Sequence, residues 1–170
     1  MKENKIKLRR LELKDASFML EWMQDKFVVC NMQNNFLNKS LDDCVEFINK
    51  SNLCSDSVHL AIVSTDDVYL GTVSLKNITE DSAEFAIAIC SRAMGKGISA
   101  EAMKQMISLG FNKLGLEYIY WCVSPENIRA LKFYDKNGYQ RVNVEELLST
   151  NGYNKDQLQF YIWYKIDRNR

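Results

Sequence analysis

The sequence is poor in several features that would assign a chain to a particular class of protein. Its 170 residues include one proline and one histidine, and 22 basic side chains are balanced by 22 acidic ones. No apolar run approaches the roughly 18 residues that a helix needs to cross a bilayer. Because binding to nucleic-acid phosphates requires a surplus of Lys and Arg, we expect neither a nucleic acid nor a membrane as partner. We expect a small substrate instead.

The five cysteines provide neither a disulfide framework nor a metal site. They lie at Cys30, Cys44, Cys54, Cys90 and Cys122. No two of them form a C-x-x-C pair, and the single histidine, His59, has no partner at the spacing of zinc ligands. Free thiols of this kind are typical of a reducing compartment. We therefore expect no metal ion and a cytoplasmic location.

Nothing in the sequence divides the chain into parts. Hydrophobic residues make up 46% and charged residues 26% of the chain, which is the ordinary balance of a globular protein. A chain of this length can bury one large core. It contains no linker, low-complexity tract or repeat. We expect one domain over residues 1–170.

The period of the hydrophobic residues changes along the chain and predicts alternating strands and helices. Strands are expected at 5–11, 58–64, 68–76, 83–89, 117–123, 139–144 and 159–166. Helices are expected at 16–23, from Ser40 onward, at 99–114 and at 127–137, with a polar loop at 31–39. This order predicts an α/β (α+β) fold, with four helices around one mixed central sheet of about seven strands. The strands at 83–89 and 117–123 should be parallel, because a helix crosses between them.

A glycine-containing segment joins the strand at 83–89 to the helix at 99–114. Gly95 and Gly97 let the backbone turn tightly, so that consecutive amide N–H groups point toward one place. The following helix leaves its first N–H groups unpaired and directs the positive end of its dipole toward the same place. The setting predicts a diphosphate site, and a plain connecting loop is the alternative.

Two other nucleotide-binding patterns fit this segment less well. A P-loop requires Ser or Thr after Gly-Lys, whereas Lys96 is followed by Gly97. A dinucleotide fingerprint fits the spacing from Gly95 to Ala100, but the acidic residue Glu117 precedes its strand instead of following it. A nicotinamide-dependent oxidoreductase is therefore the less favoured alternative.

Two motifs in this half of the chain resemble those of the GNAT N-acetyltransferase superfamily. Residues 94–102 read MGKGISAEA and look like its acyl-CoA loop. Residues 124–139 read SPENIRALKFYDKNGY and resemble its second motif, N-x-x-A-x-x-x-Y-x-x-x-G-F/Y. The loop departs from the family at Met94, where Gln or Arg is usual (Arg92 would start a shifted frame), and at Ser99, where Gly or Ala is common. The motif spacing and the order of elements agree over nearly the whole chain.

The resemblance implies that acetyl-CoA is the cosubstrate and that the two parallel strands splay apart to hold its pantetheine arm. Main-chain N–H groups of the loop would bind the diphosphate, and free backbone of the first strand would pair with the arm. The residues assigned to the coenzyme are Ile87, Ala88, Ile89, Met94, Gly95, Lys96, Gly97, Ile98, Ser99, Asn127, Ala130 and Phe133. Asn127 would bind the arm through its side-chain amide, cap the following helix, or do both.

The resemblance also implies catalytic roles for two side chains. Tyr134 matches the family tyrosine that protonates the leaving thiol, and its alternative is an aromatic core residue. An alkyl ammonium must lose a proton before it attacks, and Glu84, beside the acyl gap, is the candidate base. Its alternative is a solvated carboxylate. His59 is expected to pack or to lie at the surface, and Ser124 either contacts the sulfur or opens a turn.

These assignments predict transfer of an acetyl group from acetyl-CoA to a primary amine by direct attack in a ternary complex. The acceptor would be a small molecule or a peptide N-terminus, and the resemblance extends to ribosomal-protein, diamine and aminosugar N-acetyltransferases. The alternative is a catalytically silent acyl-CoA-binding or regulatory module on the same fold. The aromatic last strands suggest a homodimer, and burial within the sheet explains them equally well.

The acceptor is expected between the first two helices and the C-terminal strands. An aromatic and amide-rich patch in this part of the sequence consists of Trp22, Phe27, Asn31, Asn34, Asn35 and Phe36. A polyamine would favour an acidic pocket, for which Asp42, Asp43 and Glu46 are the nearest cluster. A nucleotide-linked sugar would favour basic groups, which do not cluster in this half of the sequence. The sequence leaves the choice of acceptor open.

Overall fold

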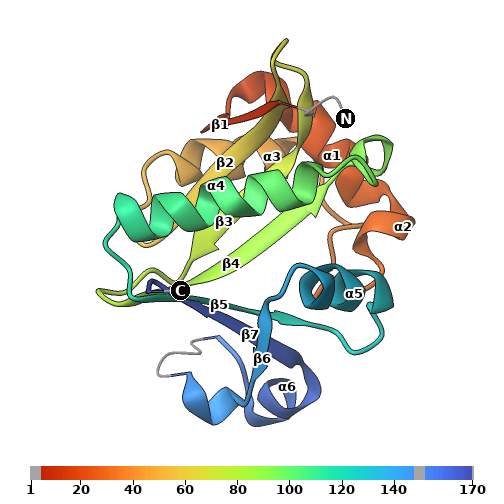
Figure 1. Cartoon of the computed structure of the whole chain (residues 1–170). Coiled ribbons are helices and arrows are strands. Elements are labelled where there is room, and N and C mark those ends of the chain that lie inside the picture. The colour runs from red at the N-terminus through yellow and green to blue at the C-terminus, as the bar shows by residue number, and fades with distance from the viewer. Residues whose placement is uncertain (1–4, 148–151, 170) are drawn as a thin grey trace.

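The computed structural model describes residues 5–147 and 152–169, which form one seven-stranded sheet with helices on both faces (Figure 1). The strands are β1 Ile6–Arg10, β2 Val58–Ser64, β3 Tyr69–Lys76, β4 Ser82–Ile89, β5 Tyr118–Val123, β6 Gln140–Val142 and β7 Ile162–Asp167. The helices are α1 Ala16–Gln24, α2 Lys26–Val29, α3 Leu41–Ser51, α4 Ile98–Asn112, α5 Ile128–Lys136 and α6 Lys155–Phe160. The strand order is β1-β2-β3-β4-β5-β7-β6, and every pair is antiparallel except β4 and β5. The predicted mixed α/β fold is confirmed.

Two short helices add to the four that the sequence predicts. Helix α2 follows Asp25, whose side chain caps its first turn. Helix α6 follows Asn154, which caps it in the same way. Because α6 runs through Phe160, the last strand begins at Ile162. The prediction that this strand starts at Gln159 is wrong, because a capped helical turn takes the place of its first residues.

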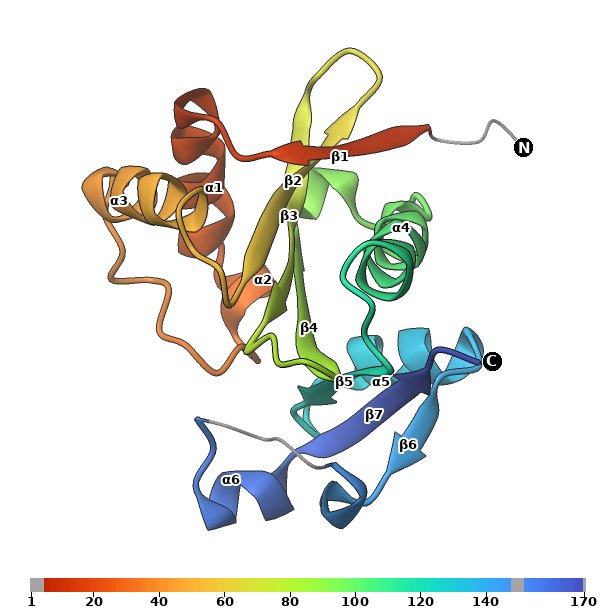
Figure 2. The ribbon, with the colours of Figure 1, turned by 90° about the vertical axis from the view of Figure 1, so that its left-hand side faces the viewer.

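Helices cover both faces of the sheet (Figure 2). Helices α1 and α3 lie on one face, where buried side chains such as Trp22 and Ile48 enter the main core. Helix α4 crosses the other face and contacts β1, β3, β4 and β5. It comes close to the sheet at Gly110, where a Cβ atom would lie 2.8 Å from Cδ1 of Ile119. The start of α4 follows β4 after a short loop, which places that helix N-terminus at the end of the strand.

Strands β4 and β5 separate after a short ladder. Their parallel pairs run only from Ser82–Tyr118 to Glu84–Tyr120. Beyond that point β4 stays paired with β3, and β5 stays paired with β7. The gap between β4 and β5 therefore opens toward their C-terminal ends, and β4 presents to it an edge without a strand partner among the described residues (Figure 1). The predicted splay is confirmed.

A second, smaller core lies on β5 and β7. It consists of Tyr118, Tyr120, Leu147 and Trp163. The indole nitrogen of Trp163 donates a hydrogen bond to the Leu158 carbonyl at 2.8 Å, which ties β7 to α6. The ring of Tyr153 packs 5.1 Å from that of Trp163. The C-terminal segment is thereby held against β5.

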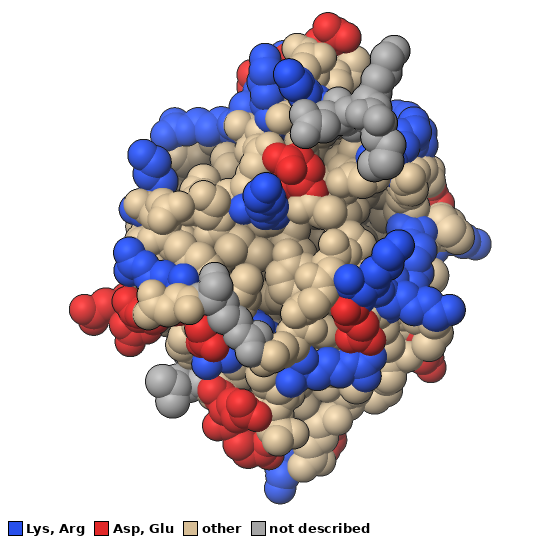
Figure 3. Space-filling view, in the orientation of Figure 1, with Lys and Arg blue, Asp and Glu red and all other residues tan. Residues whose placement is uncertain are grey.

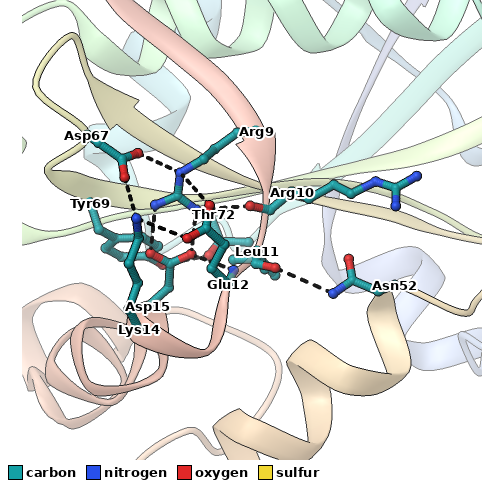
Figure 4. Close-up of polar contacts among 10 residues, drawn as sticks. All are labelled: Arg9, Arg10, Leu11, Glu12, Lys14, Asp15, Asn52, Asp67, Tyr69 and Thr72. Atoms are coloured by element: carbon teal, nitrogen blue, oxygen red, sulfur yellow. Dashed lines mark hydrogen bonds and ion pairs between the residues drawn. The ribbon is translucent and has the colours of Figure 1, made fainter.

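An ion-pair network around the buried carboxylate of Asp15 joins the first strand to the β2–β3 turn (Figure 4). Asp15 is 1% exposed and accepts two hydrogen bonds from the Arg9 guanidinium, at 2.7 and 2.9 Å. Arg9 also binds Asp67 at 2.6 Å, and Lys14 pairs with the same carboxylate. Bidentate contacts of this kind are stronger than single ones. The network ties β1, the start of the first helix and the turn together.

Charged side chains of both signs are interspersed on the face of the molecule that carries α4 (Figure 3). Within residues 5–147 and 152–169, no helix has both the length and the apolar character needed to cross a bilayer. In the same part of the chain, no three His, Cys, Asp or Glu side chains gather as a cluster that could hold a metal ion.

Candidate active site

The loop between β4 and α4 depends on glycine. Gly95 and Gly97 have φ angles of 74° and 75°, in the left-handed region that favours glycine. A Cβ atom on either residue would meet no atom of the described chain within 4 Å. Glycine is therefore required by the backbone conformation and not by crowding, and a ligand can approach the main chain of the loop closely.

Helix α4 starts directly after this loop, with Gly97 as its N-cap. The Glu101 amide donates to the Gly97 carbonyl at 3.2 Å. The N–H groups of residues 98–100 precede this bond and have no partner within the helix. Together with the helix dipole, they make the start of α4 a site for an anionic group such as a diphosphate.

Other polar groups of the loop are used within the chain. The Met94 amide donates to the Ser91 carbonyl at 3.2 Å in a short 3-10 turn. Lys96 Nζ donates to the Arg92 carbonyl at 2.9 Å, and the Arg92 guanidinium donates to the Tyr69 carbonyl at 2.9 and 3.1 Å. Because the Met94 amide belongs to the turn, the N–H groups offered to a diphosphate begin at Gly95.

The ladder between β3 and β4 determines which backbone groups face the gap. The Cys90 amide donates to the Leu70 carbonyl at 2.9 Å, and the pairing with β3 continues at Ala88. Because backbone groups alternate between the two sides of a strand, the N–H and C=O of Ala88 point toward β3. Those of Ile87 and Ile89 point into the gap. Two of the three residues predicted to pair with the pantetheine arm therefore have backbone groups available, and Ala88 is limited to side-chain contact.

Asn127 caps helix α5. Its Oδ1 accepts a hydrogen bond from the Ala130 amide at 3.1 Å, which leaves Nδ2 able to donate to a ligand. Ser124 opens the preceding turn, because its Oγ accepts a hydrogen bond from the Glu126 amide at 3.3 Å. The sequence left two roles open for each residue, and the structure confirms the helix cap for Asn127 and the turn for Ser124. Ala130 and Phe133 lie half-buried on the same helix.

Tyr134 lies in an aromatic cluster on α5. Its ring is 5.3 Å from that of Trp121 and 5.2 Å from that of Tyr164, and the residue is 7% exposed. Burial raises the pKa of the Tyr134 hydroxyl above its ordinary value. The cluster thus holds the ring in place and keeps a proton on its oxygen at neutral pH. This environment suits an aromatic core residue, and because a raised pKa makes the hydroxyl a weaker acid, a general-acid role requires negative charge to develop on the sulfur beside it.

Glu84 is buried at the closed end of the gap. It is the last residue of the β4–β5 ladder and is 4% exposed. Its carboxylate accepts hydrogen bonds from Asn77 Nδ2 at 2.9 Å and from the Tyr153 hydroxyl at 2.5 Å, and it lies 3.4 Å from Lys76 Nζ. The alternative of a solvated carboxylate is therefore wrong. Three donors hold this buried carboxylate in one orientation.

Three residues that the motifs do not indicate complete this cluster. Besides Tyr153, they are Gln33 and Cys122. Gln33 Nε2 donates to the Tyr153 hydroxyl at 3.1 Å and lies 2.9 Å from Sγ of Cys122. Burial raises the pKa of the Cys122 thiol to about 12 and also raises the pKa of the Tyr153 hydroxyl, so both groups are neutral. The three residues come from the loop after α2, from β5 and from the segment before α6, so no local pattern joins them to Glu84.

A pocket of about 370 Å³ opens beside Gln33. It is lined by Lys26, Val29, Cys30, Met32, Gln33, Asn34, Asn35, Phe36 and Leu37. Three members of the predicted acceptor patch, Asn34, Asn35 and Phe36, are among these residues. Trp22 supports the pocket from the core, with its ring 5.2 Å from that of Phe36.

The remaining predicted acceptor residues lie outside this lining. Asn31 is half-buried, and Phe27 is 66% exposed with the Arg129 guanidinium 5.3 Å from the centre of its ring. The described residues that line the pocket do not include the acidic residues Asp42, Asp43 and Glu46 either.

The acidic cluster at the start of α3 serves the helix itself. The Asp43 carboxylate accepts a hydrogen bond from the Ser40 amide at 2.7 Å, and the Ser40 hydroxyl accepts one from the Asp43 amide at 3.2 Å. The Ser40 hydroxyl also donates to the Asp43 carboxylate at 2.9 Å, and the hydrogen bonds from the Ser40 amide and hydroxyl hold the pKa of the Asp43 carboxyl below its usual value. Glu46 pairs with Lys50 at 2.5 Å. Two of the three acidic side chains are thus already used.

His59 is a packing residue. Its Nδ1 lies 2.7 Å from Oγ of Ser74, and its ring is 4.8 Å from that of Phe47. Burial, together with the charge of Lys76, lowers the pKa of His59 to about 4. The imidazole is therefore neutral at physiological pH, and the predicted packing role is confirmed.

Comparison with the sequences of known proteins agrees with this geometry. The family described as acetyltransferase (GNAT) domain matches residues 5–140. The uncharacterized N-acetyltransferase p20 of Bacillus licheniformis is 29% identical over 143 residues, which cover 81% of this chain and 80% of that protein. The spermidine N(1)-acetyltransferase of Escherichia coli strain K12 is 28% identical over 146 residues, which cover 79% of this chain and 72% of that protein.

Solved structures share the fold. The crystal structure of spermidine N-acetyltransferase from Vibrio cholerae in complex with CoA and spermine matches with a TM-score of 0.79 and 23% identity, over 98% of each chain. At this identity the likeness shows the fold alone. The family match extends from β1 through α5 to the start of β6. The chain belongs to the acetyltransferase (GNAT) domain family.

Proposed function

We propose that this acetyl-CoA-dependent N-acetyltransferase transfers the acetyl group to a primary amine of a small molecule or of a peptide N-terminus, by direct attack in a ternary complex. The gap between β4 and β5 carries the proposal. The glycine loop and the start of α4 lie at its open end, and the buried Glu84 lies at its closed end. Both reactants can therefore meet in one place.

The open end of the gap offers donors for the coenzyme. The N–H groups of residues 95–99 would bind the diphosphate, and the backbone of Ile87 and Ile89 would pair with the amides of the pantetheine arm. Asn127 Nδ2 would donate to the same arm, and the half-buried side chains of α5 would make apolar contacts. The coenzyme supplies the activated thioester, and the chain orients it.

The side chains at the closed end and on α5 would move the protons. Glu84 takes a proton from the acceptor ammonium, and the freed nitrogen forms the new C–N bond. The C–S bond then breaks, and Tyr134 gives its proton to the departing sulfur. The proton that the nitrogen loses as the amide forms restores the tyrosine, and Glu84 releases the proton it took from the ammonium to the solvent, which restores the base. General acid and general base catalysis of this kind contribute about 10²- to 10⁴-fold in rate.

An acetyl-CoA assay over polyamines, amino sugars, nucleotide-linked amino sugars and N-terminal peptides tests the proposal. We expect CoA release that depends on at least one of these amines, with an equal amount of N-acetylated product by mass spectrometry. The alternative, a catalytically silent acyl-CoA-binding module, predicts binding of acetyl-CoA with transfer to none of the amines. That result would contradict the proposed reaction.

Location and assembly belong to the same proposal. Free thiols at all five cysteines support a reducing compartment such as the cytoplasm. Phe160, which is 51% exposed at the end of α6 and packs against Tyr161, supports a homodimer through the C-terminal elements. Light scattering should give twice the mass of the chain, and substitution of Phe160 by Ser should shift it toward the monomer. A monomer at all concentrations would contradict the dimer.

A further inference from the structure

We infer that the pocket beside Gln33 is the acceptor subsite and that it takes a primary amine on an uncharged body rich in hydroxyl or amide groups. Gln33 is the residue that determines this specificity. The inference rests on the proposed acetyl transfer and deepens it by naming the chemical class of the acceptor.

Hydrogen bonds connect the pocket wall to the proposed base. Gln33 lines the pocket, and its Nε2 reaches the Tyr153 hydroxyl at 3.1 Å. That hydroxyl donates to Glu84 at 2.5 Å. Two hydrogen bonds therefore separate the wall of the pocket from the carboxylate that would receive the amine proton.

The chemistry of the wall suits an uncharged polar body. Gln33, Asn34 and Asn35 are exposed and line the pocket with three primary amides. Gln33 Nε2 already contacts Tyr153 and Cys122, so Gln33 offers its carbonyl as an acceptor, whereas Asn34 and Asn35 each offer N–H donors and a carbonyl acceptor. These groups match the hydroxyl groups of an amino sugar or the peptide groups next to an N-terminus. Phe36 and Leu37 add apolar surface for the rest of such a body.

The charges around the pocket oppose a polycation. Lys26 is the charged side chain among the described residues that line it. Lys76 lies 3.4 Å from Glu84, and Arg129 lies over the ring of Phe27 on α2. One ammonium group of a polyamine could pair with Glu84, but the others would face amides and Lys26. Like charges at close range disfavour the wrong ligand and thereby create specificity.

Competition between amines under saturating acetyl-CoA tests this specificity. The probes are glucosamine, a dipeptide amide with a free N-terminus, and spermidine. We expect kcat/KM for glucosamine or for the dipeptide amide to exceed that for spermidine at least tenfold, and the two probes distinguish a sugar from a peptide body. Spermidine as the preferred substrate would overturn the inference and leave the proposed acetyl transfer intact.

Charge variants of the pocket test the role of Gln33. Gln33→Glu should lower the preference for glucosamine or the dipeptide amide over spermidine tenfold or more, because the new carboxylate attracts ammonium groups. Added salt should weaken this effect by screening the new charge. Asn34→Asp, in the same pocket, should act in the same direction. Gln140→Glu makes the same exchange at an exposed residue of β6 and should leave the preference unchanged.

The outcomes separate the inference from the reaction on which it rests. An unchanged preference in Gln33→Glu and Asn34→Asp, with the fold intact by circular dichroism, would overturn the assigned pocket. An equal shift in Gln140→Glu would also overturn it, since overall charge would then explain the effect. Turnover of none of the probes or other amines, with acetyl-CoA bound, would overturn the proposed function itself.

Discussion

The two ends of the gap between β4 and β5 are built from different parts of the chain. The open end, which would hold the coenzyme and is called the coenzyme end below, is made by main-chain groups. These are the left-handed residues Gly95 and Gly97, the first N–H groups of α4 and the free edge of β4. The closed end, called the acceptor end below, is made by side chains. Glu84, Tyr153 and Gln33 come to it from separate segments of the chain.

This difference has a consequence for how each end tolerates substitution. Main-chain donors survive most side-chain changes, so the unusual Met94 and Ser99 leave the N–H groups from Gly95 onward in place. A side-chain site changes its charge or its hydrogen bonds with a single substitution. We therefore expect the acyl donor to be the stable property of this fold and the acceptor to be the variable one.

The largest effect is expected at the acceptor end. Glu84→Gln should lower kcat about 10²-fold or more, because the amide cannot take the amine proton. The KM for acetyl-CoA should stay the same, and the acid limb of the pH–rate profile should disappear. Glu80→Gln, at an exposed residue on the turn before β4, is the matched control. An acid limb that persists in Glu84→Gln would assign the base to water.

A smaller loss of kcat is expected from a substitution on α5, at Tyr134. Tyr134→Phe removes the proton offered to the sulfur and should lower kcat roughly 10- to 100-fold, at the low end of general acid catalysis. The dissociation constant for acetyl-CoA by calorimetry should not change. Tyr139→Phe alters a neighbour in the same aromatic cluster and should leave kcat near its original value. Equal kcat in the original enzyme and Tyr134→Phe would remove Tyr134 from the mechanism.

The coenzyme end should respond through backbone conformation. Alanine at Gly97 is strained by about 1–2 kcal/mol at a φ of 75°. In Gly97→Ala the free loop should relax away from this conformation, and because coenzyme binding must restore it, acetyl-CoA should bind about tenfold more weakly. The relative preference among amines should not change. Gly138→Ala carries the same kind of strain at a φ of 78° after α5 and should cost stability without weakening acetyl-CoA binding. If Gly97→Ala and Gly138→Ala bound acetyl-CoA with equal affinity, the result would contradict a role of the loop in coenzyme binding.

The smallest effect on activity is expected at His59, outside both ends. Its pKa is lowered from 6.5 to about 4, so the unfolded chain takes up a proton below pH 6.5 that the folded chain refuses. Stability should thus fall as the pH drops from 6.5 toward 4, by at most about 3 kcal/mol. His59→Gln should flatten this fall in urea unfolding and leave kcat near its original value. An unchanged slope would mean that other groups cause it.

The two ends also differ in how far the sequence predicts them. The coenzyme end lies in one contiguous segment, and the positions of Gly95, Gly97 and Asn127 follow from local turn and capping chemistry. The burial of Glu84 does not follow in this way, because alternation along β4 suggests an outward side chain. The C-terminal segment covers that face and brings Tyr153 to the carboxylate. Contacts between segments 69 residues apart leave no periodic signal in the sequence.

The short helices show the same limit. Helix α6 has only six residues, and an Asn such as its cap Asn154 is also common in turns, so the sequence does not signal the helix. The aromatic residues that follow favour a strand, and the predicted strand therefore begins too early. The segment at 31–39 is predicted as a loop, but its sequence does not show that Gln33 contacts Cys122 on β5.

A crystal structure of the complex with CoA tests the central claim most directly. We predict that the diphosphate oxygens lie within hydrogen-bonding distance of the N–H groups of residues 95–99, with the sulfur facing the Tyr134 hydroxyl in the gap between β4 and β5. Coenzyme bound elsewhere, or a Tyr134 hydroxyl turned away from the sulfur, would contradict the account.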